Sequence, residues 1–328
     1  MKLPRLAPKK PMAKAPAGRP ENSCRHCKRL SKRLKWLVIL ALVVFAIHYE
    51  IRTSAVQSIV LSVTAQKMSY QLQPGPSPSI IFPEYGPFDI RAGYALIPQF
   101  VQRLRANGFE ITEQVRFSPQ LERAVKLGLL PPYSEPVSTK LNIYGKDGKL
   151  LFHAPVFEDY FNSFEEIPPL IVKSLLAIEN RELKEPADNR ANPVVDWERL
   201  VKAAVLYAGN KLGLPVAVEG GSTLATQMVK YRHSYEGRTD SVLTKLRQMT
   251  NASLKVYQKG PDTREERRQI ILDYLNTVPL AAAPGYGELH GIGNGLNAWF
   301  GLSLREVINN LTLPDDNPDK ARAFKHVL

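Results

Sequence analysis

The first apolar segment of the chain is an unbroken run of apolar residues. Trp36 to Ile47 reads WLVILALVVFAI, and counting from Leu34 to Ile51 lengthens the run to eighteen residues. A transmembrane helix needs about 20 predominantly apolar residues. We therefore predict a single signal anchor over residues 36–51, with a buried core helix or a cleaved signal peptide as the alternatives. The long basic region before the run and the lack of an Ala-x-Ala sequence after it disfavour cleavage.

Residues 52–140 show a different pattern, in which short apolar stretches alternate with proline-rich breaks. This mixture predicts a small α/β lead-in next to the membrane. Within it, residues 94–108 have helical spacing and end at Gly108, a typical helix stop. Residues 141–152 then predict a β-hairpin with its turn at Asp147-Gly148.

From residue 167 onwards, apolar residues recur every three or four positions, which is typical of amphipathic helices. The first predicted helix opens at Pro168-Pro169, and Thr263 with Glu266 resembles a capping box at the start of the last one. We group residues 141–312 as one mainly α domain and residues 313–328 as a C-terminal tail. The other predicted helices cover residues 196–212, 222–232, 241–258 and 263–276.

The net charge of +13 is concentrated at the N-terminus. Residues 1–35 hold 12 of the 44 Lys and Arg residues but only one of the 31 Asp and Glu residues, so this tail carries +11. The rest of the chain is nearly neutral, which argues against a nucleic-acid partner. Basic residues stay on the cytoplasmic side of a membrane. In a bacterium this predicts an inner-membrane protein with a cytoplasmic tail over residues 1–35 and a periplasmic main domain.

Cys24 and Cys27 lie in the basic tail on either side of Arg25-His26. With His26 they offer three zinc-type ligands, one fewer than a closed site normally has. We expect reduced thiols there and no metal bound by protein side chains. The part after the anchor contains no cysteine and therefore no disulfide.

Glu179 is the first candidate for chemistry. It follows the apolar row of its helix, in line with Val172 and Leu176. A carboxylate at the end of an apolar face is less well solvated, which suits a general base. The alternative is a solvated helix end or a salt bridge to Arg181 or Lys173.

A second candidate is the stretch EGGSTLATQMVK, residues 219–230. Its paired glycines lead into a helix capped by Ser222 or Thr223. Thr223, Gln227 and Lys230 are spaced to form one polar stripe, which starts at a helix N-terminus, where free N–H groups favour an anion. This pattern indicates a phosphate or pyrophosphate site. An ordinary capped surface helix is the alternative.

Two further stretches add cations. KLRQMTN contains Lys245, Arg247 and Asn251, the last two one helical turn apart, and RRQIILDYLN begins with Arg267-Arg268. Each stretch alone would indicate only a solvated helix face.

In their order and spacing, these motifs resemble the family 51 glycosyltransferases. This family comprises the peptidoglycan glycosyltransferase domains of class A penicillin-binding proteins and the monofunctional transglycosylases. The resemblance covers about residues 141–312, and its most specific pieces are GGST…Q..K and YLN…GYG. It implies a mainly α, lysozyme-like fold. It also implies polymerisation of lipid II into β-1,4 glycan strands with release of undecaprenyl pyrophosphate.

The resemblance also implies roles for individual residues. Glu179 matches the position of the catalytic base. The positions that bind the donor pyrophosphate region match Ser222, Thr223, Gln227, Lys230, Arg247, Asn251 and Arg267. Arg267 replaces the usual Lys of its motif and keeps the charge. A divalent cation, Mg²⁺ or Mn²⁺, assists departure of pyrophosphate in such enzymes, and no organic cofactor is implied.

The chain departs from the family pattern at several positions. Asn180 stands where the first motif has Asp, Leu183 where it has Phe, and Pro186 where it has His. Asn251 replaces the second family Glu, and Asn cannot carry charge. Glu182 and Glu219 are nearby candidates to compensate. A GPDT insertion at residues 260–263 also changes the usual spacing.

These departures leave two functions open. The first is an active glycan polymerase whose partners are lipid II and the nascent glycan strand. The second is a catalytically weak domain that binds lipid II or glycan and acts as a scaffold for cell-wall synthesis proteins. Retention of Glu179 favours the enzyme, while Asn251 favours the scaffold. No transpeptidase Ser-x-x-Lys motif follows residue 312, so we expect either a monofunctional enzyme or the front of a longer protein.

The charge asymmetry around the apolar run generates a prediction about topology. We expect a reporter that is active only in the periplasm to be active when fused after Leu328, because the basic tail holds the N-terminus in the cytoplasm. A reporter that is active only in the cytoplasm should be silent at the same place. The reverse result would refute this orientation.

Overall fold

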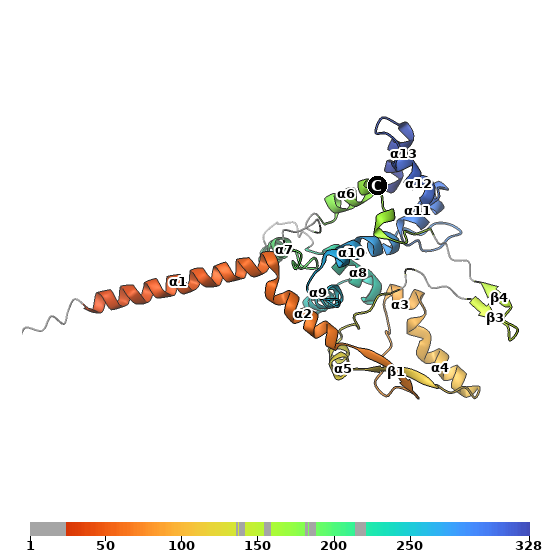
Figure 1. Cartoon of the computed structure of the whole chain (residues 1–328), viewed down its shortest axis with the longest axis horizontal. Helices are drawn as coiled ribbons and strands as arrows, with labels where there is room; N and C mark the ends of the chain where they lie inside the picture. The colour runs from red at the N-terminus through yellow and green to blue at the C-terminus, as the bar shows by residue number, and fades with distance from the viewer. Residues whose placement is uncertain are drawn as a thin grey trace, which may run out of the picture. The chain divides into compact units, whose positions relative to one another are not determined.

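The computed structural model of the chain describes residues 24–135, 137, 142–153, 159–180, 183, 188–213 and 221–328. The chain divides into two compact units, residues 1–49 and residues 50–328. Figure 1 labels the helices and strands of both units. The described part is mostly helical, which confirms the predicted mainly α fold.

The predicted apolar helix is present as α1 (Cys24–Thr53). Its portion from Arg33 to Thr53 is long and apolar enough to cross a membrane, by length and composition. The apolar side chains of residues 34–47 are exposed, as expected of a helix whose natural surroundings are lipid. Its orientation in the membrane stays a prediction.

Ser54 lies between α1 and α2 (Ala55–Lys67) and has a left-handed φ of 49°. The Glu50 carboxylate accepts hydrogen bonds from the backbone N–H groups of Val56 (2.9 Å) and Gln57 (2.8 Å). These N–H groups belong to the first turn of α2, where no carbonyl of the helix is available to them. Glu50 therefore caps α2 and stabilises the turn.

The lead-in is a small α/β layer. Strand β1 (Tyr70–Pro74) pairs antiparallel with β2 (Glu113–Phe117), with Tyr70 opposite Phe117. The helix predicted over residues 94–108 is formed by η1 (Tyr94–Leu96) and α4 (Ile97–Ala106). The remaining helices of the lead-in are α3 (Pro87–Arg91) and α5 (Pro119–Lys126).

The predicted hairpin is also present. Strands β3 (Asn142–Tyr144) and β4 (Leu150–His153) pair antiparallel. Gly148 occupies the turn with a φ of +74°, a conformation that glycine adopts without strain.

The rest of the chain is helical. Every predicted helix from residue 168 onwards is found, and α13 shows that part of the predicted tail is helical and packs against α12. The helices are η2 (Phe164–Glu166), α6 (Pro169–Ile178), α7 (Trp197–Lys211), α8 (Leu224–His233), η4 (Tyr235–Gly237), α9 (Val242–Val256), α10 (Arg264–Thr277), α11 (Ile292–Phe300), α12 (Leu304–Leu311) and α13 (Pro318–Val327).

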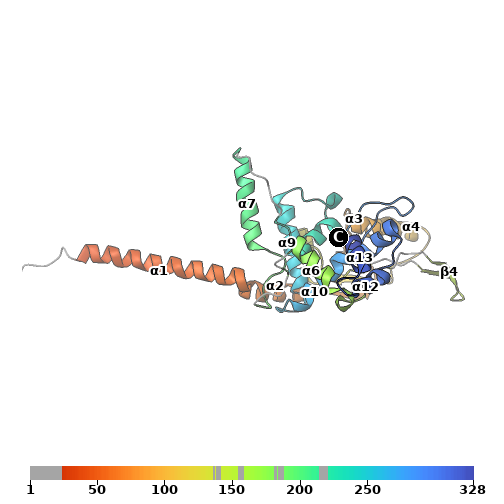
Figure 2. The ribbon, with the colours of Figure 1, turned by 90° about the horizontal axis from the view of Figure 1, so that it is seen from above.

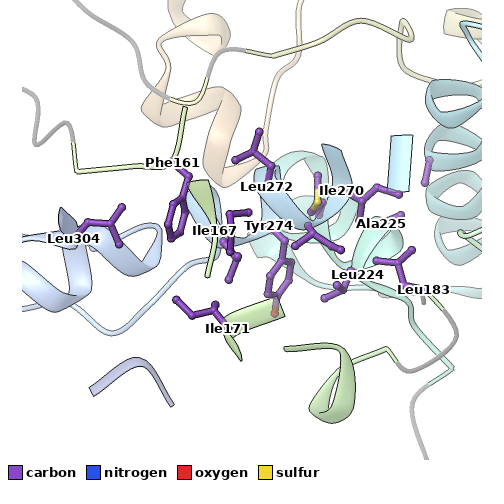
Figure 3. Close-up of a cluster of buried hydrophobic side chains, with 14 of the residues drawn as sticks. Phe161, Ile167, Ile171, Leu183, Leu224, Ala225, Ile270, Leu272, Tyr274 and Leu304 are labelled. Atoms are coloured by element: carbon purple, nitrogen blue, oxygen red, sulfur yellow. The ribbon is translucent and has the colours of Figure 1, made fainter. Parts of the chain in front are cut away.

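The main core lies between α6, α8, α10 and the C-terminal helices. Figure 3 shows Tyr274 of α10 within this cluster, with Ile171 of α6 and Leu224 of α8. Eight consecutive positions of α10, from Ile270 to Thr277, are buried, and Glu266 and Arg267 before them are buried as well. A helix buried nearly all round must lie at the centre of its domain, so α10 is the helix on which α6 and α8 pack.

The predicted capping box at Thr263 is not formed. The Thr263 hydroxyl donates instead to the carbonyl oxygens of Asn189 (2.8 Å) and Ala191 (3.2 Å), and Glu266 pairs with Lys259 (2.8 Å). The Thr263 side chain is fully buried, and the carbonyl groups of the loop before α7 need a donor there. Tertiary contacts therefore take the place of the local cap.

Buried ion pairs join the lead-in to α8. At the end of α8, Arg232 contacts Glu135 (2.6 Å), and the two ring nitrogens of His233 contact Glu135 (2.6 Å) and Asp89 (3.1 Å). Gly86 allows this close approach, because a Cβ there would meet Asp89 and the backbone of α8 at 3.0 Å or less. The lead-in is thus fastened to the helical domain by charged groups on both sides.

The network changes the pKa of its members. Burial alone would lower the pKa of His233, but the hydrogen bonds and charges of Asp89 and Glu135 outweigh burial and raise it to about 9. Burial alone would raise the pKa of Glu135. The hydrogen bond from His233 and the positive charges of His233, Arg232 and Lys255 outweigh burial and lower it to about 2.

These shifts predict how stability depends on pH. The raised pKa of His233 contributes stability that is fully present below its ordinary pKa of 6.5 and is lost as the pH rises through about 9. We expect the unfolding free energy to fall by roughly 1–3 kcal/mol between pH 6 and pH 10 through this group. Thermal unfolding of the full chain across this range should show the decline. The fall in stability with rising pH should be absent in His233→Gln and should remain in the control variant His290→Gln. A decline of equal size in His233→Gln would contradict the assignment.

Candidate active site

Glu179 lies at the C-terminal end of α6, where its backbone N–H still bonds to Leu175 (2.9 Å). The side chain is half-buried. Arg199, at the start of α7, donates to the Glu179 backbone carbonyl (3.1 Å). This bond satisfies a carbonyl that the end of a helix leaves without a partner. It fixes the backbone that carries the carboxylate.

The Glu179 carboxylate is oriented by α8. Its Oε2 accepts a hydrogen bond from the Gln227 amide (3.1 Å), and the Gln227 oxygen in turn lies 3.5 Å from the Tyr274 hydroxyl. Burial, and then the charge of Glu179, raise the pKa of Tyr274, so its hydroxyl stays protonated and able to donate. A chain of hydrogen bonds therefore runs from α10 through α8 to the carboxylate.

Positive charge gathers near the start of the same helix. Lys245 of α9 donates to the Ser222 hydroxyl (2.6 Å), next to the N-terminus of α8. Burial, and then the charge of Lys230, lower the pKa of Lys245. Within the described residues neither lysine has a carboxylate partner. Two ammonium groups without a described carboxylate partner create a place where an anion is favoured.

Thr223 has a different role from the one its spacing suggested. Its hydroxyl is 1% exposed, donates to the carbonyl of Val194 (2.8 Å) and forms a capping box with Thr226. It therefore fixes the start of α8 and does not reach the surface that Gln227 and Lys230 share. Its contact with substrate stays a prediction.

The comparison with known families agrees with this arrangement. The model of the transglycosylase family matches residues 151–314, half of the chain. The chain belongs to this family. Peptidoglycan glycosyltransferase activity is the function of this domain class, with lipid II or a glycan strand as substrate. None of the curated proteins matches the chain.

Two residues of this transglycosylase domain lie away from Glu179. The Arg247 guanidinium lies against Gly128 of the lead-in, and the Asn251 amide oxygen accepts from the backbone N–H of Leu130 (2.9 Å). Both residues are on the side of α9 that faces the lead-in, opposite Lys245. Their predicted contact with the donor pyrophosphate stays a prediction.

Helix α8 separates Asn251 from Glu179. Asn251 lines a small cavity of about 60 Å³ together with Ala225, Val229 and Arg232 of α8. At 3.6 residues per turn these three residues lie on the opposite side of α8 from Gln227 and Lys230. The second family Glu would therefore face this cavity and the ion pairs around it.

The charges of the cavity explain the neutral residue at position 251. Its lining contains three carboxylates and three cations. Asn251 is 8% exposed, and a carboxylate at this depth would add a fourth negative charge to the lining. The charged groups are Glu135, Glu266, Asp273, Arg232, His233 and Lys255.

Asn180, the other neutral replacement, is 1% exposed. Neither polar atom of its amide has a hydrogen-bond partner in the part of the chain that the structure describes. An aspartate there would bury a charge, and burying a charge costs more than burying an amide. Leu183, at the position of the family Phe, is buried in the main core. Glu182, Pro186 and Glu219 lie outside the described residues.

Arg267 holds a loop instead of facing solvent. It is 6% exposed, and it donates to the backbone carbonyls of Leu183 (3.3 Å) and Ala191 (2.7 Å) and to the Thr263 hydroxyl (3.1 Å). Burial lowers its pKa to about 10, so it remains charged at neutral pH. Arg267 thus supports the segment that follows Glu179, and direct contact with substrate stays a prediction.

The described side chains do not form a metal site of their own. No three His, Cys, Asp or Glu residues among them come together to hold an ion. Lys245 lies beside Ser222 at the start of α8 and Lys230 lies in its last turn, and the charges of both can act on a phosphate without a metal. A divalent cation carried by the pyrophosphate itself stays a prediction.

Sequence reasoning overlooked two groups at this site. Tyr274 belongs to the YLN motif, but its spacing gave no sign that its hydroxyl would reach Gln227. Lys245 was noted as one cation of a helix face, although its neighbours Ser222 and Lys230 come from another helix. In both cases the partner is more than ten residues away in sequence, and only the packing of helices brings them together.

The contacts of Arg267 generate a prediction about stability. Arg267→Met removes a buried guanidinium and its hydrogen bonds to the Leu183 and Ala191 carbonyls, so we expect a loss of about 2–5 kcal/mol in unfolding free energy. Arg268→Met, at the exposed neighbouring position, should change it by no more than about 0.5 kcal/mol. Thermal and urea unfolding of both variants measures the difference. Equal stability of the two variants would show that Arg267 is not a structural residue.

Proposed function

We propose that this chain polymerises lipid II into β-1,4 glycan strands and releases undecaprenyl pyrophosphate. The observation that carries the proposal is the arrangement along one side of α8. Gln227 orients a carboxylate at one point, and Lys230 with Lys245 and Ser222 supplies an anion site nearby. A base and a leaving-group site side by side are what an inverting glycosyl transfer needs.

The proposed reaction assigns each group a step. Glu179 accepts the proton of the acceptor 4-hydroxyl as that oxygen attacks C1 of the donor sugar. The bond between C1 and the pyrophosphate oxygen breaks, and the electron pair leaves with the pyrophosphate. Lys230 and Lys245 stabilise the charge that develops there. Attack from the side opposite the leaving group inverts C1, as a β-linkage from an α-linked donor requires.

Helix α7 supports a substrate that is anchored in lipid. It projects from the rest of the residue 50–328 unit (Figure 2). Val201, Val205 and Leu212 follow one stripe along it and are exposed by 59% to 82%. An exposed apolar stripe on a helix suits contact with the interface of a bilayer. Lipid II would reach Glu179 from such a surface.

The scaffold alternative rests on the two neutral replacements, Asn180 and Asn251. Both are explained above by burial and charge balance, and neither replacement removes a group that contacts Glu179 in the described residues. Glu179 and the two lysines proposed to hold the anion, Lys230 and Lys245, are all retained. We therefore place the polymerase first and keep lipid II binding without turnover as the second function.

Removal of the base tests the proposal. Glu179→Gln keeps the shape of the side chain but cannot accept a proton, so we expect polymerisation of labelled lipid II to fall by about 10²–10⁴. Lipid II binding should remain within a few-fold of wild type. Glu306→Gln, an exposed carboxylate on α12, is the matched control and should polymerise normally.

The same assay separates the two functions. Polymer made by Glu179→Gln at the wild-type rate would show that Glu179 is not the base. A wild-type chain that binds lipid II but makes no polymer, with or without Mg²⁺ or Mn²⁺, would favour the scaffold.

A further inference from the structure

The lead-in contains a cavity of about 620 Å³ that the glycosyl transfer does not use. It lies between the β1–β2 sheet, α3, α4 and the segment that follows α5. Pockets of 300–1,000 Å³ are typical of sites that enclose small molecules. Only His233 of its lining belongs to the helical domain, and Glu179, Gln227 and Lys230 do not line it.

The walls of this lead-in pocket are aromatic. Six rings line it, from Tyr70, Phe82, Tyr85, Tyr94, Phe117 and Tyr133. Two of them are held in edge-to-face pairs, Tyr85 with Tyr235 (5.9 Å between centroids) and Tyr94 with Phe88 (6.1 Å). Rings fixed in this way present their faces and edges without a large loss of side-chain entropy on binding.

The charged groups of the pocket are nearly all acidic. The described lining holds three carboxylates, Glu84, Asp89 and Glu135, and neither lysine nor arginine. Its one basic side chain, His233, is already held between Asp89 and Glu135. Glu84 is exposed and has no ion-pair or hydrogen-bond partner among the described residues. A negative charge therefore remains available beside an aromatic cavity.

We propose that the lead-in pocket binds a small organic cation, an ammonium group carried on an apolar body. The apolar body fills the space between the rings, and the ammonium group lies near Glu84 and against the tyrosine faces. Aromatic faces attract cations through their quadrupole. An anionic ligand of the same shape would be repelled by the Glu84 carboxylate, which is unpaired within the described residues, whereas the charges of Asp89 and Glu135 are already balanced by His233 and Arg232. The proposal does not depend on the activity of Glu179.

Three indole compounds of similar size test the charge requirement. Tryptamine carries an ammonium group, tryptophol is neutral, and indole-3-propionate is an anion. Their binding to the full chain in phosphatidylcholine nanodiscs is measured by calorimetry, with empty nanodiscs as the blank. We expect tryptamine to bind more tightly than tryptophol by about three- to tenfold, and indole-3-propionate not to bind. Equal affinity for the three compounds, or no binding of tryptamine, would overturn the proposal.

Variants place the binding in this cavity. Glu84→Gln should weaken the binding of tryptamine by about three- to tenfold and leave the binding of tryptophol unchanged, because the substitution removes only the charge. Glu110 is an exposed carboxylate of the lead-in outside the pocket, and Glu110→Gln should change the affinity for neither compound. Val115→Trp should fill the cavity and abolish binding of both compounds. Thermal unfolding shows whether Val115→Trp is folded, and the exposed position of Glu84 keeps its variant informative in any case. Tryptamine binding unaffected by Glu84→Gln would also overturn the proposal.

Discussion

The ion pairs at the end of α8 determine where that helix lies. Arg232 and His233 are buried with Glu135 and Asp89, and none of these four charges could remain in the interior without the others. At the other end of α8, the buried Thr223 cap is bonded to Val194. Because both ends of α8 are held, Gln227 between them is also held in the place from which it donates to Glu179. The geometry of the base thus depends on contacts that lie outside the site.

This dependence gives the lead-in a structural role. Asp89 and Glu135 come from the segment before the transglycosylase match, which begins at residue 151. Asn251 binds the same segment at Leu130, and α2 packs on α9. The helical domain of this chain therefore has a charged face that the lead-in covers. The neutral Asn251 belongs to that face, where an additional carboxylate would disturb the balance of charge.

The sequence predicted those features that local rules control. Helical spacing located α6 to α10 within a few residues, because each of these helices buries one apolar side. The YGKDGKL turn located the β3–β4 hairpin, because its glycine can adopt a positive φ. The motifs identified Glu179 and Gln227, which the structure brings together. The predicted capping box at Thr263 was wrong, because the Thr263 hydroxyl donates to backbone carbonyls of the loop before α7 and does not cap α10.

What the sequence could not predict are pairings between distant segments. Arg267 and Lys245 look alike in their sequence contexts, as cations on amphipathic helices. In the structure the first is enclosed by the carbonyls of the loop after Glu179, and the second lies beside Ser222 and Lys230. Burial decides between the two roles, and burial depends on which helix packs against which. The same holds for Arg247 and Asn251, whose side of α9 faces the lead-in.

The separation of charges along α8 has a consequence for the chemistry. Gln227 is the only side chain that the structure places on the Glu179 carboxylate, within the residues described. A lysine at position 227 would pair with that carboxylate and favour its charged form over the protonated one that follows proton transfer. An amide orients the carboxylate without this competition. Lys245 lies beside Ser222 before the start of α8, and Lys230 lies in its last turn. Helix α8 thus carries both the amide that orients the Glu179 carboxylate and, three residues later, Lys230.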